Sequence, residues 1–536
     1  MWNDTPAPPG MAGLSRPDDM DTPSCISLAL NAHIPYGAGE NCFFEALSEN
    51  FLPLLAVFDR LEGDHIPFRM GISLSPVLCH LLSDEVLQQR YVSYIDKQIE
   101  FGERELERTA GKDNLHLLAK TYYDKAVDRR IAFTERYERN ILNAFDHYHV
   151  KGKIELLTSS ATHAFLPLLA PYPEAVQAQM EVAIASYRHY FGKYPQGFWL
   201  PELGWTPELE EYLRAYNFSY TIVNTHGMVF GKPPARRGSF YPAITPKGLF
   251  TLARDSTAAR DLSRMLRDTA YRDNNRDAGY ELSAGELGLF LIPGGSRIVT
   301  GYKYYRSAGP GEQVYDPAAA SLKAVEHARM FLEAQSARFQ EAAKYMDEVP
   351  ISLCAWDADT FGRFWHEGPQ FLEALFRLSV GYRDIQFMNP SEYLYKQNAG
   401  SFETMVPEFS SWGTNGYGEM WLDASNDWMY RHMVQALDRM TELAERFPDD
   451  TGLKERALNQ AARELLLVQA SDWPKLLYKQ EYPEFARAQI EDSLRNFTTI
   501  YETLGSNYIS TEWLTKLEKR HNIFPAINYR VFRRKK

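Results

Sequence analysis

Residues 197–206, GFWLPELGWT, decide how the rest of the chain is interpreted. The apolar run Gly197–Leu200 predicts a short buried strand that ends at Pro201 and Glu202, and a helix is expected from Pro207. In a β/α barrel the carboxyl ends of the strands carry the catalytic groups, so a rigidly held Glu202 would face the active site. The alternative is a glutamate that only stabilises the start of the next helix, where acidic side chains are favourable.

A second acidic residue follows a second strong strand far along the chain. Residues 349–356, VPISLCAW, form an apolar run, and Asp357 stands at its end. Asp357 lies too far before the helix expected at Gln370 to cap it. Its rival, Asp359, lies further from the strand end. Two carboxylates on separate strand ends are typical of glycosidic bond chemistry, with Glu202 as the nucleophile and Asp357 as the general acid/base of a retaining mechanism.

Three histidines also lie at predicted strand ends. His33, His163 and His226 each come shortly after an apolar run that predicts a strand. Together with Glu202 they would form a ring around a cleft at the carboxyl ends of the barrel strands. They could donate hydrogen bonds to sugar hydroxyls, or they could bind a metal ion together with an acidic residue. The residues alone leave both interpretations open.

The composition describes a large acidic protein with many aromatic side chains. The 536 residues carry a formal net charge of −12 with a pI near 5.6, which argues against nucleic acid and anionic membranes as partners. Aromatic residues make up 13%, and flat amphipathic rings suit a groove for a sugar chain. The four scattered cysteines fit a reducing compartment, and no apolar window of about 18 residues predicts a membrane span. We therefore expect a cytoplasmic protein.

Changes in composition divide the chain into parts. Residues 1–24 are rich in Pro, Asp and Gly and predict a flexible leader. Residues 25–400 contain the predicted strands. They are interrupted at about 83–150 by charged segments with helical spacing, which indicate a helical insertion. Residues 401–536 begin with a tryptophan-containing loop and continue with three long predicted helices, so we expect a helical C-terminal domain.

Seven motifs in a fixed order carry a resemblance to a known family. They are AHIPY at 32–36, LLTSSATHAFLPLL at 156–169, FWLPELGW at 198–205, VNTHG at 223–227, AWDADTFGRFW at 355–365, SSWG through WLDASNDWMYRH at 410–432, and LLLVQASDWP at 465–474. On these motifs the chain resembles glycoside hydrolase family 57, and within it the 1,4-α-glucan branching enzymes, over nearly its whole length.

The resemblance implies an α/β fold, a distorted (β/α)7 barrel with a helical insertion and a C-terminal all-helical domain. It places the family's nucleophile on Glu202 and its acid/base on Asp357. It also implies a protein that acts on an α-1,4-glucan, such as amylose or glycogen, without a metal or cofactor. We expect a monomer. The family's substrate-contacting positions correspond to His33, His163, Trp412, Trp421, Asp472 and Trp473.

The chain departs from the family's pattern at five positions. Asn31 and Asn224 replace a histidine and an aspartate, and Asp359 and Arg363 replace a glutamate and a histidine of the acid/base motif. The fifth is Arg237, which stands where branching members usually carry a tyrosine at the tip of a loop over the cleft. That tip is thought to exclude water and guide the acceptor chain, so Arg237 would contact substrate.

Three functions remain open at this point. The first is a branching enzyme that cleaves an α-1,4 bond, holds the fragment on Glu202 and transfers it to a 6-hydroxyl, forming an α-1,6 branch. Because of Arg237, the alternative is an α-amylase-like hydrolase or a 4-α-glucanotransferase at the same site. Because of the other departures, a further alternative is a non-catalytic glucan-binding protein with a decayed site.

Overall fold

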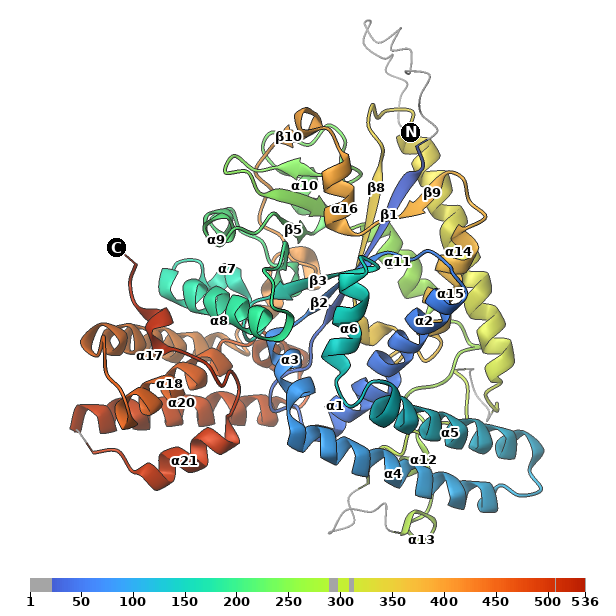
Figure 1. Ribbon diagram of the computed structural model, residues 1–536, viewed down its shortest axis with the longest axis horizontal. Coiled ribbons are helices and arrows are strands. Elements are labelled where there is room, and N and C mark those ends of the chain that lie inside the picture. The colour runs from blue at the N-terminus through green and yellow to red at the C-terminus, as the bar shows by residue number, and fades with distance from the viewer. Residues whose placement is uncertain (1–21, 289–296, 308–312, 507, 536) are drawn as a thin grey trace, which may run out of the picture.

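The computed structural model describes residues 22–288, 297–307, 313–506 and 508–535, so the predicted leader (1–24) lies almost entirely outside the described residues. Figure 1 shows a central sheet surrounded by helices, with a group of C-terminal helices packed against one side. Within these described ranges, no helix is long and apolar enough to span a membrane. All four cysteines are free.

Seven parallel strands form the core of the sheet. In the order in which they pair, they are β1 (Ser24–Ala32), β2 (Met70–Leu74), β3 (Ile154–Ser159), β4 (Gly197–Trp199), β5 (Tyr220–Val223) and β7 (Phe250–Ala253), with β8 (Ile351–Asp357) on the other edge of β1. A single parallel bridge between Arg254 and Leu353 closes the ring. This confirms the predicted distorted (β/α)7 barrel. The distortion lies between β7 and β8, where one bridge takes the place of a ladder.

The strand sequences agree with burial on both faces. Every residue of β2 and β3 is buried, as expected for parallel strands that are covered on both sides. Three short strands extend this core: β6 (Ala243–Ile244) pairs antiparallel with β7, β10 (Glu403–Thr404) pairs with β6, and β9 (Ile385–Phe387) pairs with the first half of β1.

Amphipathic helices cover the outside of the barrel (Figure 1). They include α2 (Leu52–Gly63), α8 (Pro173–Phe191), α9 (Leu209–Ala215), α11 (Ser256–Met265), α14 (Pro317–Ala342) and α15 (Gly368–Ser379). Helix α8 packs on β3, α11 on β8 and α15 on β9, while α14 and α2 pack against α15.

Three α-helices lie within the predicted insertion at about 83–150: α4 (Glu85–Arg108), α5 (Asp113–Ile131) and α6 (Ile141–Val150). Helix α3 (Pro76–Ser83) precedes them after β2. The Asp84 side chain accepts hydrogen bonds from the first turn of α4, which explains why this helix begins there. Gly111, with φ of 78°, lies in the turn between α4 and α5, where the sequence predicted a break.

In the described residues from 427 onwards, the C-terminal region contains five α-helices: α17 (Asp427–Arg446), α18 (Leu453–Val468), α19 (Asp472–Lys479), α20 (Pro483–Ser506) and α21 (Thr511–Arg520). The central helix α18 is buried along most of its length. Between α18 and α19 the chain touches the barrel, because the Ser471 N–H donates to the His163 carbonyl oxygen at 3.2 Å. This contact brings α19 to the carboxyl end of β3.

Candidate active site

Glu202 is held in a strained turn directly after β4. Glu202 and Leu203 have positive φ angles of 58° and 49°, a conformation that costs a non-glycine residue about 1–3 kcal/mol. The Glu202 carbonyl oxygen accepts a hydrogen bond from the Trp412 backbone N–H at 3.0 Å, and the residue is 3% exposed. Such strain persists only where the surrounding structure enforces it, so the direction of the Glu202 side chain is fixed by its neighbours.

Two donors hold the Glu202 carboxylate. The Trp412 indole Nε1–H donates to Oε2 at 2.6 Å. The Lys475 ammonium, which comes from α19, lies 3.1 Å from Oε1 and 3.4 Å from Oε2. Hydrogen bonds between a carboxylate and an N–H or an ammonium group are charge-assisted and therefore short and strong. These are the surroundings that an anionic nucleophile requires.

Asp357 lies at the end of β8 in different surroundings. The β1–β8 register pairs it with Asn31, whose Nδ2 donates to Asp357 Oδ1 at 3.2 Å. Burial raises the pKa of Asp357, and the negative charge of Glu202 raises it further, while Lys475 opposes the shift. A carboxyl group with a raised pKa keeps its proton to higher pH, as a general acid must.

Asp359, the rival acid, faces a different set of charges. Its Oδ2 accepts from Arg363 Nη1 at 2.8 Å, and Arg363 also donates to Glu45 at 3.1 Å. Burial raises the pKa of Asp359 as well, but Arg363 opposes this shift. Two of the departures from the family pattern thus pair with each other, while Asp357 is the carboxyl group whose charge interacts with Glu202 and Lys475.

His33 and His163 form a stacked pair beside these carboxylates. Their ring centroids lie 4.1 Å apart, at an interplanar angle of 7°. His33 Nε2 lies 3.0 Å from Asp472 Oδ2, and His163 Nε2 lies 3.3 Å from the same Asn31 amide that binds Asp357. Burial, together with the nearby His33, lowers the pKa of His163 well below its usual value. A neutral His163 can accept from the Asn31 amide.

The third strand-end histidine lies elsewhere. His226 Nε2 donates to the Gly416 carbonyl oxygen at 2.9 Å, and Asn224 Nδ2 donates to the Ser411 carbonyl oxygen at 2.7 Å. Both side chains therefore hold the loop that carries Trp412. The three histidines do not converge on one point, and the described part of the chain contains no group of three or more His, Cys, Asp or Glu side chains that could hold a metal ion.

The tryptophans predicted to contact substrate occupy unlike positions. Trp412 is half-buried at Glu202, with the Arg254 guanidinium over its ring at 5.1 Å. Trp421 is fully buried, and its ring centroid lies 4.5 Å from that of Phe165. It packs against Gly413 and so supports the loop that carries Trp412. Trp473 is 3% exposed and donates from Nε1 to a backbone carbonyl oxygen of α18 at 2.8 Å. Of the three, only Trp412 touches a candidate catalytic group.

Arg237 is not brought to the carboxylates. Its guanidinium binds Asp347 at 2.7 Å and the Ser401 carbonyl oxygen at 2.6 Å. Asp347 precedes the first residue of β8, whereas Asp357 is the last, and a seven-residue strand spans about 20 Å. Arg237 therefore lies near the opposite end of the barrel from Asp357, and its guanidinium stabilises the connection into β8.

Lys475 and Arg254 are site residues that the sequence interpretation did not identify. Burial alone lowers the pKa of Lys475, but the charges of Glu202 and Asp357 outweigh it and raise the pKa above its usual value. The sequence did hold a signal for Lys475, because residues three apart share one face of a helix and Asp472 was already a candidate. Arg254 lines a hollow of about 260 Å³ next to Asp357 and Trp412.

A parallel barrel with two carboxyl groups at its strand ends, beside an aromatic ring and hydrogen-bonding side chains, fits the barrel enzymes that act on glycosidic bonds. Two family descriptions match the chain in separate ranges. Residues 27–405 match "Glycosyl hydrolase family 57", and residues 432–532 match "1,4-alpha-glucan branching enzyme, C-terminal". The chain belongs to glycosyl hydrolase family 57. The predicted boundary between the catalytic domain and the C-terminal domain, at residues 400 and 401, stays a prediction.

Three relatives show the extent of the similarity. The 1,4-α-glucan branching enzyme of Thermococcus kodakarensis is 27% identical, over 94% of this chain and 77% of its own length. The α-amylase AmyC from Thermotoga maritima superimposes with a TM-score of 0.89 at 33% identity, over 96% of this chain and all of its own. The branching enzyme from Pyrococcus horikoshii gives a TM-score of 0.86 at 25% identity, over 96% of this chain and 97% of its own.

Proposed function

We propose that the protein is a retaining 1,4-α-glucan branching enzyme, with Glu202 as the nucleophile and Asp357 as the general acid/base. The observation that carries this proposal is the contrast between the two carboxyl groups. Glu202 lies against the Lys475 ammonium and the Trp412 N–H, whereas burial raises the pKa of Asp357. Two neighbouring carboxyl groups in such different surroundings are suited to different roles, one as the nucleophile and the other as the acid.

In the first half of the proposed reaction, Glu202 attacks the anomeric carbon of an α-1,4-linked glucose. Asp357 donates its proton to the glycosidic oxygen that leaves, and the cut chain departs with a free 4-hydroxyl. The donor fragment remains bonded to Glu202 as a glycosyl ester. Burial supports this step, because a carboxyl group with a raised pKa is protonated over a wider pH range.

In the second half, the 6-hydroxyl of an acceptor chain attacks the same anomeric carbon. Asp357, now ionised, takes the hydroxyl proton, and Glu202 leaves as a carboxylate. Two displacements restore the α configuration, and the product carries an α-1,6 branch. The relatives named as branching enzymes and the matched C-terminal region support transfer to a sugar hydroxyl.

Hydrolysis is the second candidate, since the AmyC structure with 33% identity carries the name α-amylase. The site chemistry would be unchanged except that water takes the place of the 6-hydroxyl. A 4-α-glucanotransferase would use a 4-hydroxyl instead. The substrate in each case is an α-1,4-glucan. We place the protein in the cytoplasm, in line with its free cysteines, and propose that it is a monomer.

One experiment separates these reactions. Amylose is incubated with the protein, and reducing ends are counted directly and again after a debranching enzyme. Branching predicts few new ends in the direct count and many after debranching. Hydrolysis predicts a rising direct count and no additional ends. If neither count rises, chain-length analysis distinguishes α-1,4 transfer from a decayed site.

A further inference from the structure

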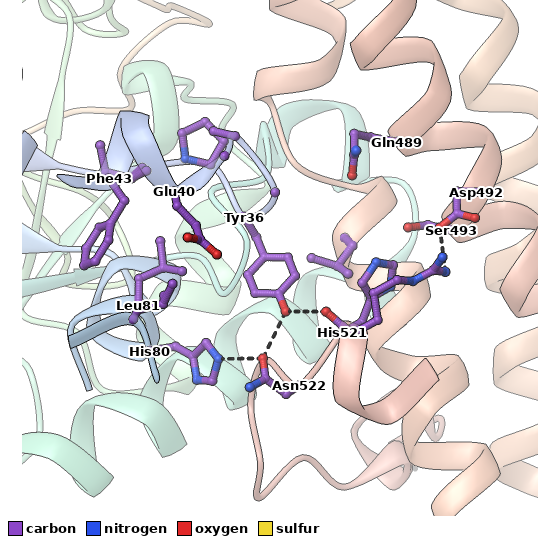
Figure 2. Close-up of a pocket in the computed structure, with 18 of the residues that line it drawn as sticks. Tyr36, Glu40, Phe43, His80, Leu81, Gln489, Asp492, Ser493, His521 and Asn522 are labelled. Atoms are coloured by element: carbon purple, nitrogen blue, oxygen red, sulfur yellow. Dashed lines mark hydrogen bonds and ion pairs between the residues drawn. The ribbon is translucent and has the colours of Figure 1, made fainter. Parts of the chain in front are cut away.

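A cavity of about 830 Å³ lies between the barrel and the C-terminal helices. Figure 2 shows its walls: Tyr36 and Glu40 from the segment after β1, His80 from α3, and Gln489 from α20. Its volume falls in the range of sites for small organic ligands, about 300–1,000 Å³.

The cavity shares a wall with the candidate active site. Ile34 and Trp473 line it. They directly follow His33 and Asp472, whose side chains lie 3.0 Å apart beside the candidate catalytic carboxylates. The same two chain segments therefore face the reaction on one side and this cavity on the other. A ligand here would lie close to a polymer that occupies the cleft.

Neutral hydrogen-bonding groups converge at the centre of the cavity. The Tyr36 hydroxyl lies 3.0 Å from Asn522 Oδ1, which also accepts from His80 Nε2 at 3.1 Å (Figure 2). Burial lowers the pKa of His80, so its ring is neutral at physiological pH. The Tyr36 ring lies 6.2 Å from that of His80 and 6.1 Å from that of His521, which gives the cavity an aromatic face. Aromatic faces with hydroxyl and amide groups at their edges match the surface of a sugar.

The charges around the cavity balance. Four acidic and four basic side chains line it, apart from the histidines. Several are paired, including Arg90 with Glu40 and Arg520 with Asp492, the latter at 2.7 Å. A site without net charge does not attract a phosphorylated or cationic ligand over a neutral one. The chemistry favours a neutral, hydroxyl-rich molecule.

Residues 34–40, the segment after β1, form one edge of the cavity opposite Gln489. Gly37 and Gly39 have φ angles of 88° and 91°, and a side chain at Gly37 would approach Gln489 Oε1 to 3.1 Å. The backbone thus passes close to α20, and Gln489 stands at the edge where a larger side chain would enter the space.

We propose that this cavity binds a segment of an α-glucan chain and serves as a second docking site next to the catalytic cleft. The inference rests on the proposed function for the identity of the sugar. It adds a site outside the catalytic residues, formed jointly by the barrel and the C-terminal helices.

The test measures binding in the Glu202→Gln variant, where no turnover changes the ligand. Mobility in native gels that contain amylose gives the dissociation constant. Gln489→Trp is added to fill the edge of the cavity, and Glu484→Trp, an exposed position on the same helix, is the matched control. Asn522→Ala, at an exposed position, is a second variant that removes polar contacts without adding bulk. Thermal unfolding confirms that each variant is folded.

We expect Gln489→Trp to weaken amylose binding about tenfold, Asn522→Ala to weaken it less, and Glu484→Trp to leave it unchanged. Equal binding in the Gln489→Trp, Asn522→Ala and control variants would overturn the proposal, as would an absence of amylose binding in the Glu202→Gln parent. The branching assay on the wild-type protein tests the proposed function separately. If the wild-type protein is active and these variants bind amylose as the parent does, only the proposal of a second site is contradicted.

Discussion

At the end of β4, the Glu202 carboxylate faces an ammonium group and an indole N–H; at the end of β8, the Asp357 carboxyl group faces a neutral amide. Both lie at the carboxyl edge of one barrel, and both are largely shielded from water. Their difference comes from their neighbours, and all three of these groups, on Lys475, Trp412 and Asn31, are far from either acid in sequence. A position at a strand end makes a carboxyl group available for catalysis, and the surrounding donors decide which role it takes.

The largest effect is expected at Glu202, the proposed nucleophile. Replacing Glu202 by Gln keeps the shape of the side chain and removes the attacking oxygen anion, so both branching and hydrolysis should fall by more than about 10⁴-fold. The measurement is the rate of change in amylose chain length. Glu211→Gln, on the exposed side of α9, is the control and should retain activity. Appreciable turnover in the Glu202→Gln variant would contradict its assignment.

Asp357, the proposed acid, should show a smaller loss of activity, and the size of the loss should depend on the leaving group of the substrate. Asp357→Asn removes the proton donor and should lower activity on amylose by about 10²–10⁴-fold. Formation of the glycosyl-enzyme from an α-maltosyl fluoride should fall much less, because fluoride leaves without protonation. Stopped-flow release of fluoride measures this step.

Asp359→Asn is the matched control for the acid. Its carboxylate pairs with Arg363, so the variant should be less stable. Its activity on amylose and on α-maltosyl fluoride should change by the same factor. If Asp359→Asn showed the dependence and Asp357→Asn did not, the two acids would have to exchange roles.

Lys475 links the two carboxyl groups, and its removal tests that link. The ammonium lowers the pKa of Asp357, so Lys475→Met should raise this pKa. Because Asp357 must be protonated to act as the acid, activity is lost as pH rises through its pKa, and the basic limb of kcat/KM should move to higher pH. We also expect about a tenfold loss of rate, equivalent to about 1.4 kcal/mol, from disturbance of Glu202.

Lys479→Met, on the exposed side of the same helix, controls for the loss of a lysine from α19. It should leave the pH profile unchanged. A Lys475→Met variant whose basic limb stays in place, or moves to lower pH, would show that Lys475 does not act on Asp357.

The strand ends were predictable because they depend on local patterns. Glu202 and Asp357 each follow a short apolar run, and a parallel barrel brings the carboxyl ends of all its strands to one edge. The position of His163 beside His33 follows from the same rule. The seven-stranded barrel itself was predicted correctly, although the single bridge that closes it depends on residues on either side of a long connection.

What the sequence did not reveal depends on contacts between distant segments. Lys475 reaches Glu202 because the break before α19 packs on the carboxyl end of β3, a tertiary contact without a local pattern. Trp421 and Trp412 look equivalent as tryptophans in one loop, yet Trp421 is fully buried against Phe165 whereas Trp412 is half-buried and contacts Glu202. A motif shows which residue type stands at a position. Whether its side chain is buried, and which way it points, depends on the rest of the fold.

Arg237 is where the motif and the structure differ most, and it supports the smallest predicted effect. Its guanidinium binds Asp347 and the Ser401 carbonyl oxygen near the far end of β8, away from both carboxyl groups. Arg237→Ala should therefore leave the ratio of branches to reducing ends unchanged and lower the free energy of unfolding by about 1 kcal/mol or less, because Asp347 is largely exposed. Urea unfolding and the two-count amylose assay measure these quantities on one preparation. A shift from branching to hydrolysis in this variant would mean that the loop reaches the acceptor chain during turnover, and the doubt raised by the sequence motif would then be justified.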